Sequence, residues 1–260
     1  MHILEVICLK KGYYLYLAAL FVITGCNGEA NTNITQQSQP PAVITYENEP
    51  EKTKGGTVFT MPEKIMLDVP LIKQNPELKY GCEVTSLAMV LNYAGVKVDK
   101  MELYRGVRKE YDPLDNPGGN NIKKWGDPNK GFVGDMTGNF PGYAVFEKPI
   151  VELMDKYLPG RTVNLTDMEF NDVLKHIGNG FPAVIWTTGD FRLPDRWESW
   201  LHGKRTIRTP LDLHAVVLVG YDSENVYVND PLSGKKQHGV NKEKFILSWK
   251  ALKKRTVSYK

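Results

Sequence analysis

The sequence predicts an α+β fold, because helical and strand patterns occupy successive parts of the chain. Between residues 82 and 178, apolar side chains recur at helical spacing in several segments. After residue 180 the pattern changes to apolar, β-branched and aromatic runs that are separated by turn residues. Helices followed by antiparallel strands are typical of the α+β class. The domain organisation that we expect is a leader at 1–25, a linker at 26–62 and one folded domain at 63–260.

The first expected helix starts at Cys82 and stops at Gly95. Its apolar residues lie three or four positions apart, which predicts a helix that is buried at the centre of the domain. These residues are Val84, Leu87, Ala88, Leu91 and Ala94.

Capping patterns predict three further helices. Asp99 and Glu102 have the spacing of a capping box, and so do Thr166 and Glu169 before the segment FNDVLKHIG. Pro149 suits the first turn of another helix, because its missing N–H is not needed there.

Three runs predict strands, at residues 182–188, 214–222 and 225–230. The turn at Asp222-Ser223-Glu224-Asn225 predicts a hairpin between the last two. Because a hairpin folds the chain back on itself, residue 230 should return beside residue 214.

Two long loops interrupt these elements. Residues 112–143 are rich in Gly, Asn, Asp and Pro, and Trp125 and Phe132 within them favour an ordered loop that borders a substrate groove. Residues 190–210 carry two tryptophans, which either contact substrate or attach a surface loop to the core.

Cys82 is the only cysteine of the folded domain and stands at an expected helix start. Backbone N–H groups at a helix start carry partial positive charge, which favours the reactive thiolate. Gly81 precedes it and, lacking a Cβ, is expected to let a substrate approach the sulfur. A small buried hydrophobic residue is the alternative role for a lone cysteine. We therefore expect a nucleophile at Cys82, with a thiol pKa below the ordinary value.

His214 and Asp230 are the expected partners of this nucleophile. His214 begins one strand and Asp230 ends the next, so the hairpin places them together. Asp222 is a rival to Asp230, but at a rise of about 3.3 Å per residue it lies about 26 Å along the strand from His214. A cysteine with separated histidine and aspartate residues is the arrangement expected of a thiol-based catalyst.

The stretches LDVPLIKQNPELKYGCEVTSLAMVLNYAGVKVD, HAVVLVGYD and VYVNDP resemble the bacteriocin-processing, double-glycine leader peptidases. They resemble more closely the stand-alone relatives of those enzymes, which are papain-like cysteine peptidases. The resemblance covers most of residues 63–260. It implies a papain-like α+β fold, in which a helix carrying the cysteine packs on an antiparallel sheet carrying the histidine and aspartate.

The same resemblance implies a role for each site residue. Cys82 attacks, His214 is the base, Asp230 orients it, and Gln74 contributes to the oxyanion hole. Gln74 stands further upstream of Cys82 than is usual in the family. We expect no transporter region after the domain, so the leader-peptide specificity of the transporter-fused members is not implied.

The first residues resemble a bacterial lipoprotein signal peptide. Two lysines precede an apolar run that is suited to export but short for a membrane span, and the run ends in the lipobox-like ITGC at Cys26. Residues 28–55 are poor in large apolar side chains and fit a flexible tether. We expect an exported protein that is anchored on the extracellular face of the cell membrane through lipid on Cys26. An ordinary signal peptide is the alternative.

The expected function is hydrolysis of peptide bonds in a peptide or protein substrate, without a cofactor. A metal site is not expected, because no Cys/His cluster has ligand spacing. Asp127, Asn129 and Gly131 alternate as in a calcium loop, but Gly138 stands where the loop needs a carboxylate. The net charge of +3 includes no long basic run, so nucleic acid is not an expected partner. An amidase or acyl transferase, and a non-catalytic peptide- or cell-wall-binding lipoprotein, stay open as alternatives.

Overall fold

The computed structural model describes residues 62–118 and 121–260. The expected signal peptide at 1–25, the lipidation site Cys26 and the linker up to residue 61 lie outside the described residues. Within the two described ranges, every helix is too short or too polar to cross a membrane.

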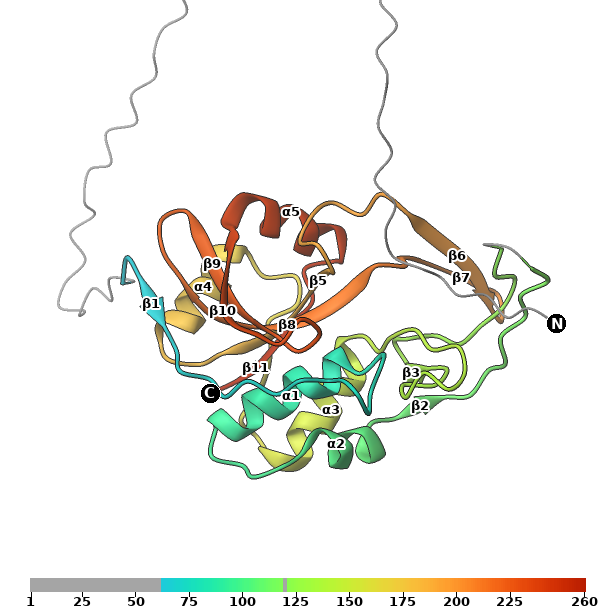
Figure 1. Cartoon of the computed structure of the whole chain (residues 1–260), viewed down its shortest axis with the longest axis horizontal. Coiled ribbons are helices and arrows are strands. Elements are labelled where there is room, and N and C mark those ends of the chain that lie inside the picture. The colour runs from blue at the N-terminus through green and yellow to red at the C-terminus, as the bar shows by residue number, and fades with distance from the viewer. Residues whose placement is uncertain (1–61, 119–120) are drawn as a thin grey trace, which may run out of the picture. The chain divides into compact units, whose positions relative to one another are not determined.

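A seven-stranded sheet forms the centre of the fold, and all its paired strands run antiparallel (Figure 1). Its two central strands read as continuous apolar runs because helices cover both faces. The order across the sheet is β10 (Lys235–Asn241), β9 (Asn225–Asp230), β8 (Leu213–Tyr221), β5 (Ala183–Thr188), β11 (Thr256–Tyr259) and β4 (Thr162–Asn164), with β1 (Ile65–Met66) beside β8.

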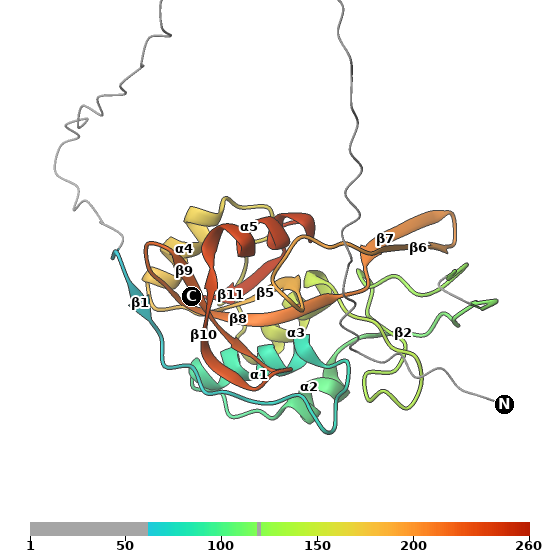
Figure 2. The same cartoon turned by 45° about the horizontal axis from the view of Figure 1, so that its top comes forward.

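Helices cover both faces of this sheet (Figures 1 and 2). One face carries α1 (Cys82–Tyr93), α2 (Lys100–Gly106) and α3 (Glu147–Tyr157), and the other carries α4 (Phe170–Gly178) and α5 (Lys242–Ala251). The residues of α1 from Cys82 to Leu91 are all buried, as expected for a central helix. The predicted α+β fold, with the cysteine helix packed on an antiparallel sheet, is confirmed.

One of the two predicted capping boxes is wrong. Asp99 caps α2 as expected, accepting a hydrogen bond from the Glu102 N–H at 2.7 Å. The cap residue of α4 is instead Glu169, which makes no side-chain cap bond. Thr166 precedes this cap by three residues, and its hydroxyl instead accepts a hydrogen bond from the Thr256 N–H of β11 at 3.2 Å.

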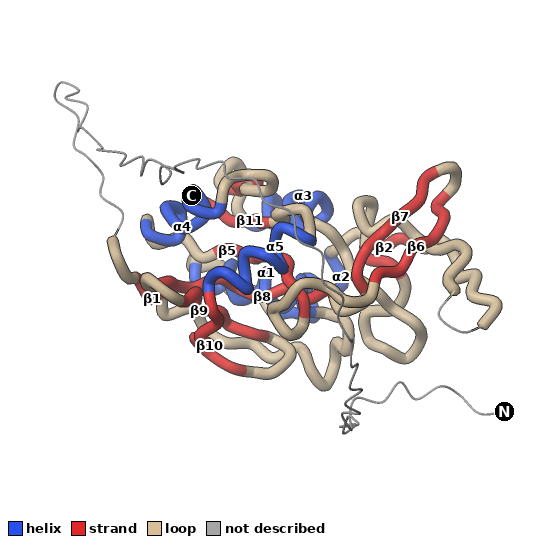
Figure 3. Tube along the Cα trace, turned by 90° about the horizontal axis from the view of Figure 1, so that it is seen from above, coloured by secondary structure: helices blue, strands red, loops and turns tan. Residues whose placement is uncertain are grey.

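A hairpin occupies the predicted loop at 190–210, at one end of the described domain (Figure 3). Its strands are β6 (Trp197–His202) and β7 (Arg205–Pro210), joined by the two residues Gly203 and Lys204. Gly203 has a φ of +59°, a conformation that favours glycine and suits a tight hairpin turn.

The described residues of the long loop at 112–143 pack against this hairpin. The loop contains β3 (Phe132–Val133), which pairs in parallel with β2 (Lys109–Glu110) just before the loop. Trp200 of β6 is buried, its ring centroid lies 5.8 Å from that of Trp125, and its Nε1 donates to the Gly126 carbonyl at 2.8 Å. Of the two roles considered for the tryptophans of this segment, attachment to the core is therefore the one that Trp200 serves.

Candidate active site

Cys82 is the first residue of α1, and the helix places it against the strand that carries His214. Ser86, one turn further along α1, donates from its Oγ to the carbonyl of Ala215 at 3.2 Å. Ala215 follows His214 directly in β8. The Cys82 side chain is buried, with 7% of its surface exposed.

Gly81 serves packing within its own turn. A Cβ at Gly81 would lie 2.5 Å from the Cβ of Leu78, closer than two carbons can approach. Its φ of −102° is open to any residue, so the glycine is required by this contact and not by its backbone conformation. The prediction that Gly81 leaves room for substrate is wrong, because Leu78 takes that room.

His214 and Asp230 form a buried hydrogen-bonded pair on neighbouring strands. The distance from His214 Nε2 to Asp230 Oδ1 is 2.8 Å, and the residues are 3% and 5% exposed. Asp230 also accepts hydrogen bonds from the Leu232 N–H at 2.9 Å and the Ser233 hydroxyl at 2.5 Å.

These contacts decide which imidazole nitrogen is available as a base. Burial opposes ionisation of Asp230, but the hydrogen bonds and the His214 charge outweigh it and lower the pKa of the carboxyl. An ionised carboxylate only accepts hydrogen bonds, so Nε2 of His214 is the donor. In the neutral ring, Nδ1 then carries the free lone pair.

Asp222 does not take part in this pair. Its carboxylate accepts hydrogen bonds from the N–H groups of Glu224 and Asn225 at 2.9 and 2.7 Å and from the Tyr227 hydroxyl at 2.6 Å. These contacts lower its pKa to about 2 and fix the hairpin turn between β8 and β9.

Gln74 lies between the end of β9 and the turn that precedes Cys82. Its backbone N–H donates to the Pro231 carbonyl at 2.9 Å, and its side-chain Nε2 donates to the Lys79 carbonyl at 2.8 Å. The residue is 2% exposed. An amide nitrogen has two hydrogens, so the contact with Lys79 leaves one for another acceptor.

Glu83 is a residue of this site that the sequence analysis missed. It is fully buried, its Oε1 accepts the Val145 N–H at 2.9 Å, and its Oε2 accepts the Cys82 thiol at 3.4 Å. Within the described ranges, no hydrogen bond joins the Cys82 sulfur to His214. A pattern in the sequence could have revealed Glu83, because CEVTSLAMVLNY contains one charged residue in a helix expected to be central.

Glu83 and burial together overturn the expected thiol pKa. Burial first, and then the neighbouring Glu83 charge, raise the pKa of Cys82 well above its usual range, although backbone hydrogen bonding from Ala215 opposes this. Burial also raises the pKa of Glu83, to about 7. The prediction of a lowered thiol pKa is wrong for this arrangement, because the helix start contributes less than burial and a nearby carboxyl.

The long loop reaches the cysteine turn, but not through the two aromatic residues that were predicted to border a groove. Phe132 has no exposed surface and packs in the main core, so its predicted groove role is wrong. Trp125 is 6% exposed and lines a cavity of about 300 Å³ next to the exposed ring of Phe140. The contact with the cysteine turn is made by Met136, whose carbonyl accepts the Tyr80 N–H at 2.9 Å.

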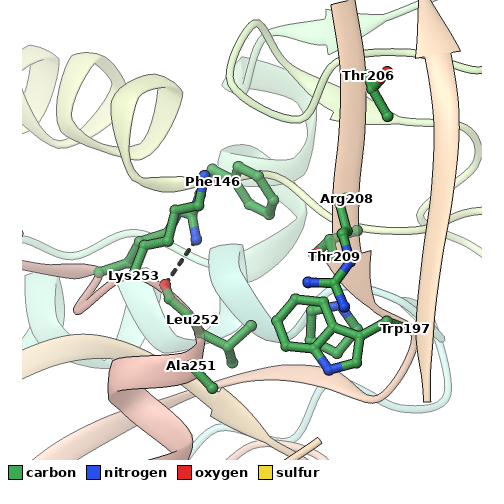
Figure 4. A pocket seen from close by; sticks show the side chains of 10 residues that line it. Phe146, Trp197, Thr206, Arg208, Thr209, Ala251, Leu252 and Lys253 are labelled. Carbon is green, nitrogen blue, oxygen red and sulfur yellow. Dashed lines mark hydrogen bonds between the residues drawn. The ribbon is translucent and has the colours of Figure 1, made fainter.

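A second cavity has a volume of about 400 Å³ (Figure 4). Its lining includes Phe146, which follows Val145, the residue whose N–H donates to Glu83. Phe146, Trp197 and Arg208 line it together with the turn at the end of α5. The Arg208 guanidinium lies 4.3 Å from the centre of the Trp197 ring, and that of Arg255 lies 3.7 Å from the centre of the Phe146 ring. Ring faces and cationic groups therefore share this cavity.

Two acidic groups away from the cysteine could suggest metal binding. Asp127 Oδ1 accepts hydrogen bonds from the backbone and side chain of Asn129, and Oδ2 lies 3.2 Å from Arg205 Nη1. Nitrogen donors therefore surround the oxygens that a calcium ion would need. Glu110, Asp112 and His202 also lie close together, but the Lys130 ammonium is 2.7 Å from His202 Nε2 and supplies a positive charge at that place.

Comparisons with known proteins agree with this architecture. The model of the Peptidase_C39 like family matches residues 66–257. YvpB of Bacillus subtilis (strain 168), an uncharacterised protein, is 40% identical over 188 residues, which make up 72% of each chain. A crystal structure from Bacillus anthracis, described as a candidate C39-like peptidase, superposes with a TM-score of 0.70 at 39% identity. That match covers 76% of this chain and 98% of the other, and the resemblance inferred from the sequence is confirmed.

Proposed function

Because the chain belongs to the Peptidase_C39 like family, we propose that it is a cysteine peptidase with Cys82, His214 and Asp230 as its catalytic groups. One observation carries this proposal: the buried 2.8 Å hydrogen bond between His214 and Asp230, at the start of the strand on which the Cys82 helix packs. A carboxylate that fixes an imidazole beside a thiol is the arrangement that activates a cysteine nucleophile.

In the proposed reaction, His214 Nδ1 takes the proton of the Cys82 thiol. The thiolate attacks the carbonyl carbon of a peptide bond, and the negative oxygen that forms is stabilised by the Cys82 N–H and by Gln74 Nε2. His214 then protonates the leaving amine, and water hydrolyses the thioester to regenerate the thiol. The S–H group points to Glu83 Oε2 in this structure, so it must turn towards His214 Nδ1 before the proton can move.

Hydrolysis of peptide bonds can be tested with the thiol itself. Cys82 is the only cysteine in residues 63–260, so iodoacetamide modifies a single thiol of a protein that begins there. We expect mass spectrometry of a peptide library to show cleavage products with the untreated domain and none after alkylation. Products that persist after alkylation would assign the cleavage to another agent. Hydrolysis of amides other than peptide bonds would favour an amidase, transfer of the acyl group to an amine would favour an acyl transferase, and bound but intact peptides would favour the non-catalytic alternative.

We also propose that the protein is exported and attached to the membrane through lipid on Cys26. The lipobox-like ITGC and the polar segment that follows it support this location. Replacing Cys26 by Ala is expected to move the protein from the membrane fraction to the soluble fraction of the cell envelope or medium. Equal membrane association of the parent and the variant would contradict a lipid anchor at this residue.

A further inference from the structure

Glu83 is the one charged residue of α1, and each of its two carboxyl oxygens accepts a hydrogen bond inside the protein. Oε1 accepts the Val145 N–H at 2.9 Å, which fixes the carboxyl plane. Oε2 faces the Cys82 sulfur at 3.4 Å. Burying a carboxylate without a countercharge is unfavourable, so a fully buried acid next to a candidate nucleophile calls for a functional explanation.

The surrounding groups give Glu83 no cationic partner. Among the described residues, none of the ion pairs includes Glu83. Arg255, the residue before β11, is paired with Glu147 of α3 at 2.7 Å. The Tyr143 hydroxyl, from the long loop, is held by the Thr209 hydroxyl at 2.6 Å.

Two further contacts complete these surroundings. The Tyr143 hydroxyl is also held by the Pro210 carbonyl, at 2.7 Å, so both contacts tie it to β7. From β8, the imidazole of His214 is held by Asp230. Cys82 is therefore the group whose charge responds most directly to that of Glu83.

We propose that Glu83 is a positioning residue that controls whether Cys82 can form a thiolate. When neutral, Glu83 donates its O–H to the sulfur and stabilises the thiolate. When ionised, it accepts the S–H hydrogen bond and repels negative charge on the sulfur, so that the thiol keeps its proton. The proton that leaves the sulfur goes to His214 Nδ1, and Glu83 retains its own. The role in turnover rests on the proposed function, whereas the effect on the thiol does not.

The direction of the pH effect follows from burial. Because burial raises the pKa of Glu83 to about 7, the acid is neutral below that pH and ionised above it. Rising pH therefore works against the thiolate in this site, opposite to its effect on a free cysteine. At pH 8, about one molecule in ten retains the neutral acid.

The rate of Cys82 alkylation by iodoacetamide tests this proposal without any substrate. Glu83→Gln keeps the carbonyl that accepts the Val145 N–H and presents an N–H to the sulfur, so it imitates the neutral acid. We expect it to react about tenfold faster than the parent at pH 8 and within about twofold at pH 5.5. Glu243→Gln, at an exposed position in the first turn of α5, is the matched control and should follow the parent at both pH values.

A rate ratio that is the same at pH 5.5 and pH 8 would overturn the proposal, because a purely structural change affects both. Glu83→Met is a second variant that removes the charge without supplying a donor, and its rate at pH 8 should fall between those of the parent and Glu83→Gln. A shifted alkylation profile in a protein that cleaves no peptide would retain this inference and reject the proposed function. A protein that cleaves peptides but shows an unshifted alkylation profile would support the proposed function and reject the role of Glu83.

Discussion

Replacing His214 by Ala is expected to lower kcat for peptide hydrolysis by roughly 10⁴-fold, because it removes the group that accepts the thiol proton and later protonates the leaving amine. The buried hydrogen bond to Asp230 gives His214 a fixed tautomer, and no other histidine has a buried carboxylate partner within the described ranges. Steady-state kinetics on the cleaved peptide, with thermal unfolding to check the fold, would measure this loss.

His238→Ala is the matched control for that experiment. His238 lies on β10 and contacts Phe191, with 6.0 Å between ring centroids. Its removal should leave kcat within about twofold of the parent, as for a substitution away from the reacting groups. An equal loss in the two variants would indicate that histidine removal acts through stability, and full activity of His214→Ala would reject the proposed triad.

The free energy of unfolding is expected to fall by about 3 kcal/mol as the pH rises from about 4.5 to about 7 through the contribution of Glu83. In the folded protein burial raises the pKa of this acid to about 7, whereas its ordinary value is 4.5. Between these values the folded state holds a proton that the unfolded state has lost, so stability is highest below 4.5 and is lost as the pH rises. Each pH unit of this window corresponds to about 1.4 kcal/mol.

Urea unfolding at pH 4.5 and pH 7.5 would measure this contribution as a difference between two proteins. Glu83→Gln cannot ionise, so it should lack the decrease that the parent shows. Other groups titrate in the same range, such as His176, whose pKa is lowered by burial and which acts in the opposite direction. Because these groups are common to both proteins, the difference isolates Glu83, and parallel pH profiles would show that its acid is not held neutral.

The central elements were predictable from the sequence because their periodicity is local. The helix at Cys82 and the strands that carry His214 and Asp230 each follow from apolar spacing and turn residues, and the hairpin between the strands then determines their pairing. The hairpin β6–β7 was not predicted. Its main partner is the long loop at 112–143, so its packing depends on contacts between segments that no local pattern connects.

The chemistry of the site was less predictable than its location. A helix start favours a thiolate, and that effect can be inferred from the position of Cys82 alone. Burial and the Glu83 carboxyl have the opposite effect on the thiol pKa. They can be inferred only when it is known which side chains the fold excludes from water. Likewise, Gly81 was explained by substrate access, although the atom that requires it belongs to Leu78, three residues earlier.

The place of β11 in the sheet constrains the order in which the protein can acquire its structure. This strand follows all the others along the chain, yet it lies between β5 and β4 and supplies the backbone partners of both. The residue just before it, Arg255, pairs with Glu147 at the start of α3. A nascent chain that still lacks these residues contains β5 and β4 without the strand that joins them. The two strands therefore become parts of one sheet only when β11 docks between them, so closure of this side of the sheet depends on the strand that lies furthest along the chain from β4.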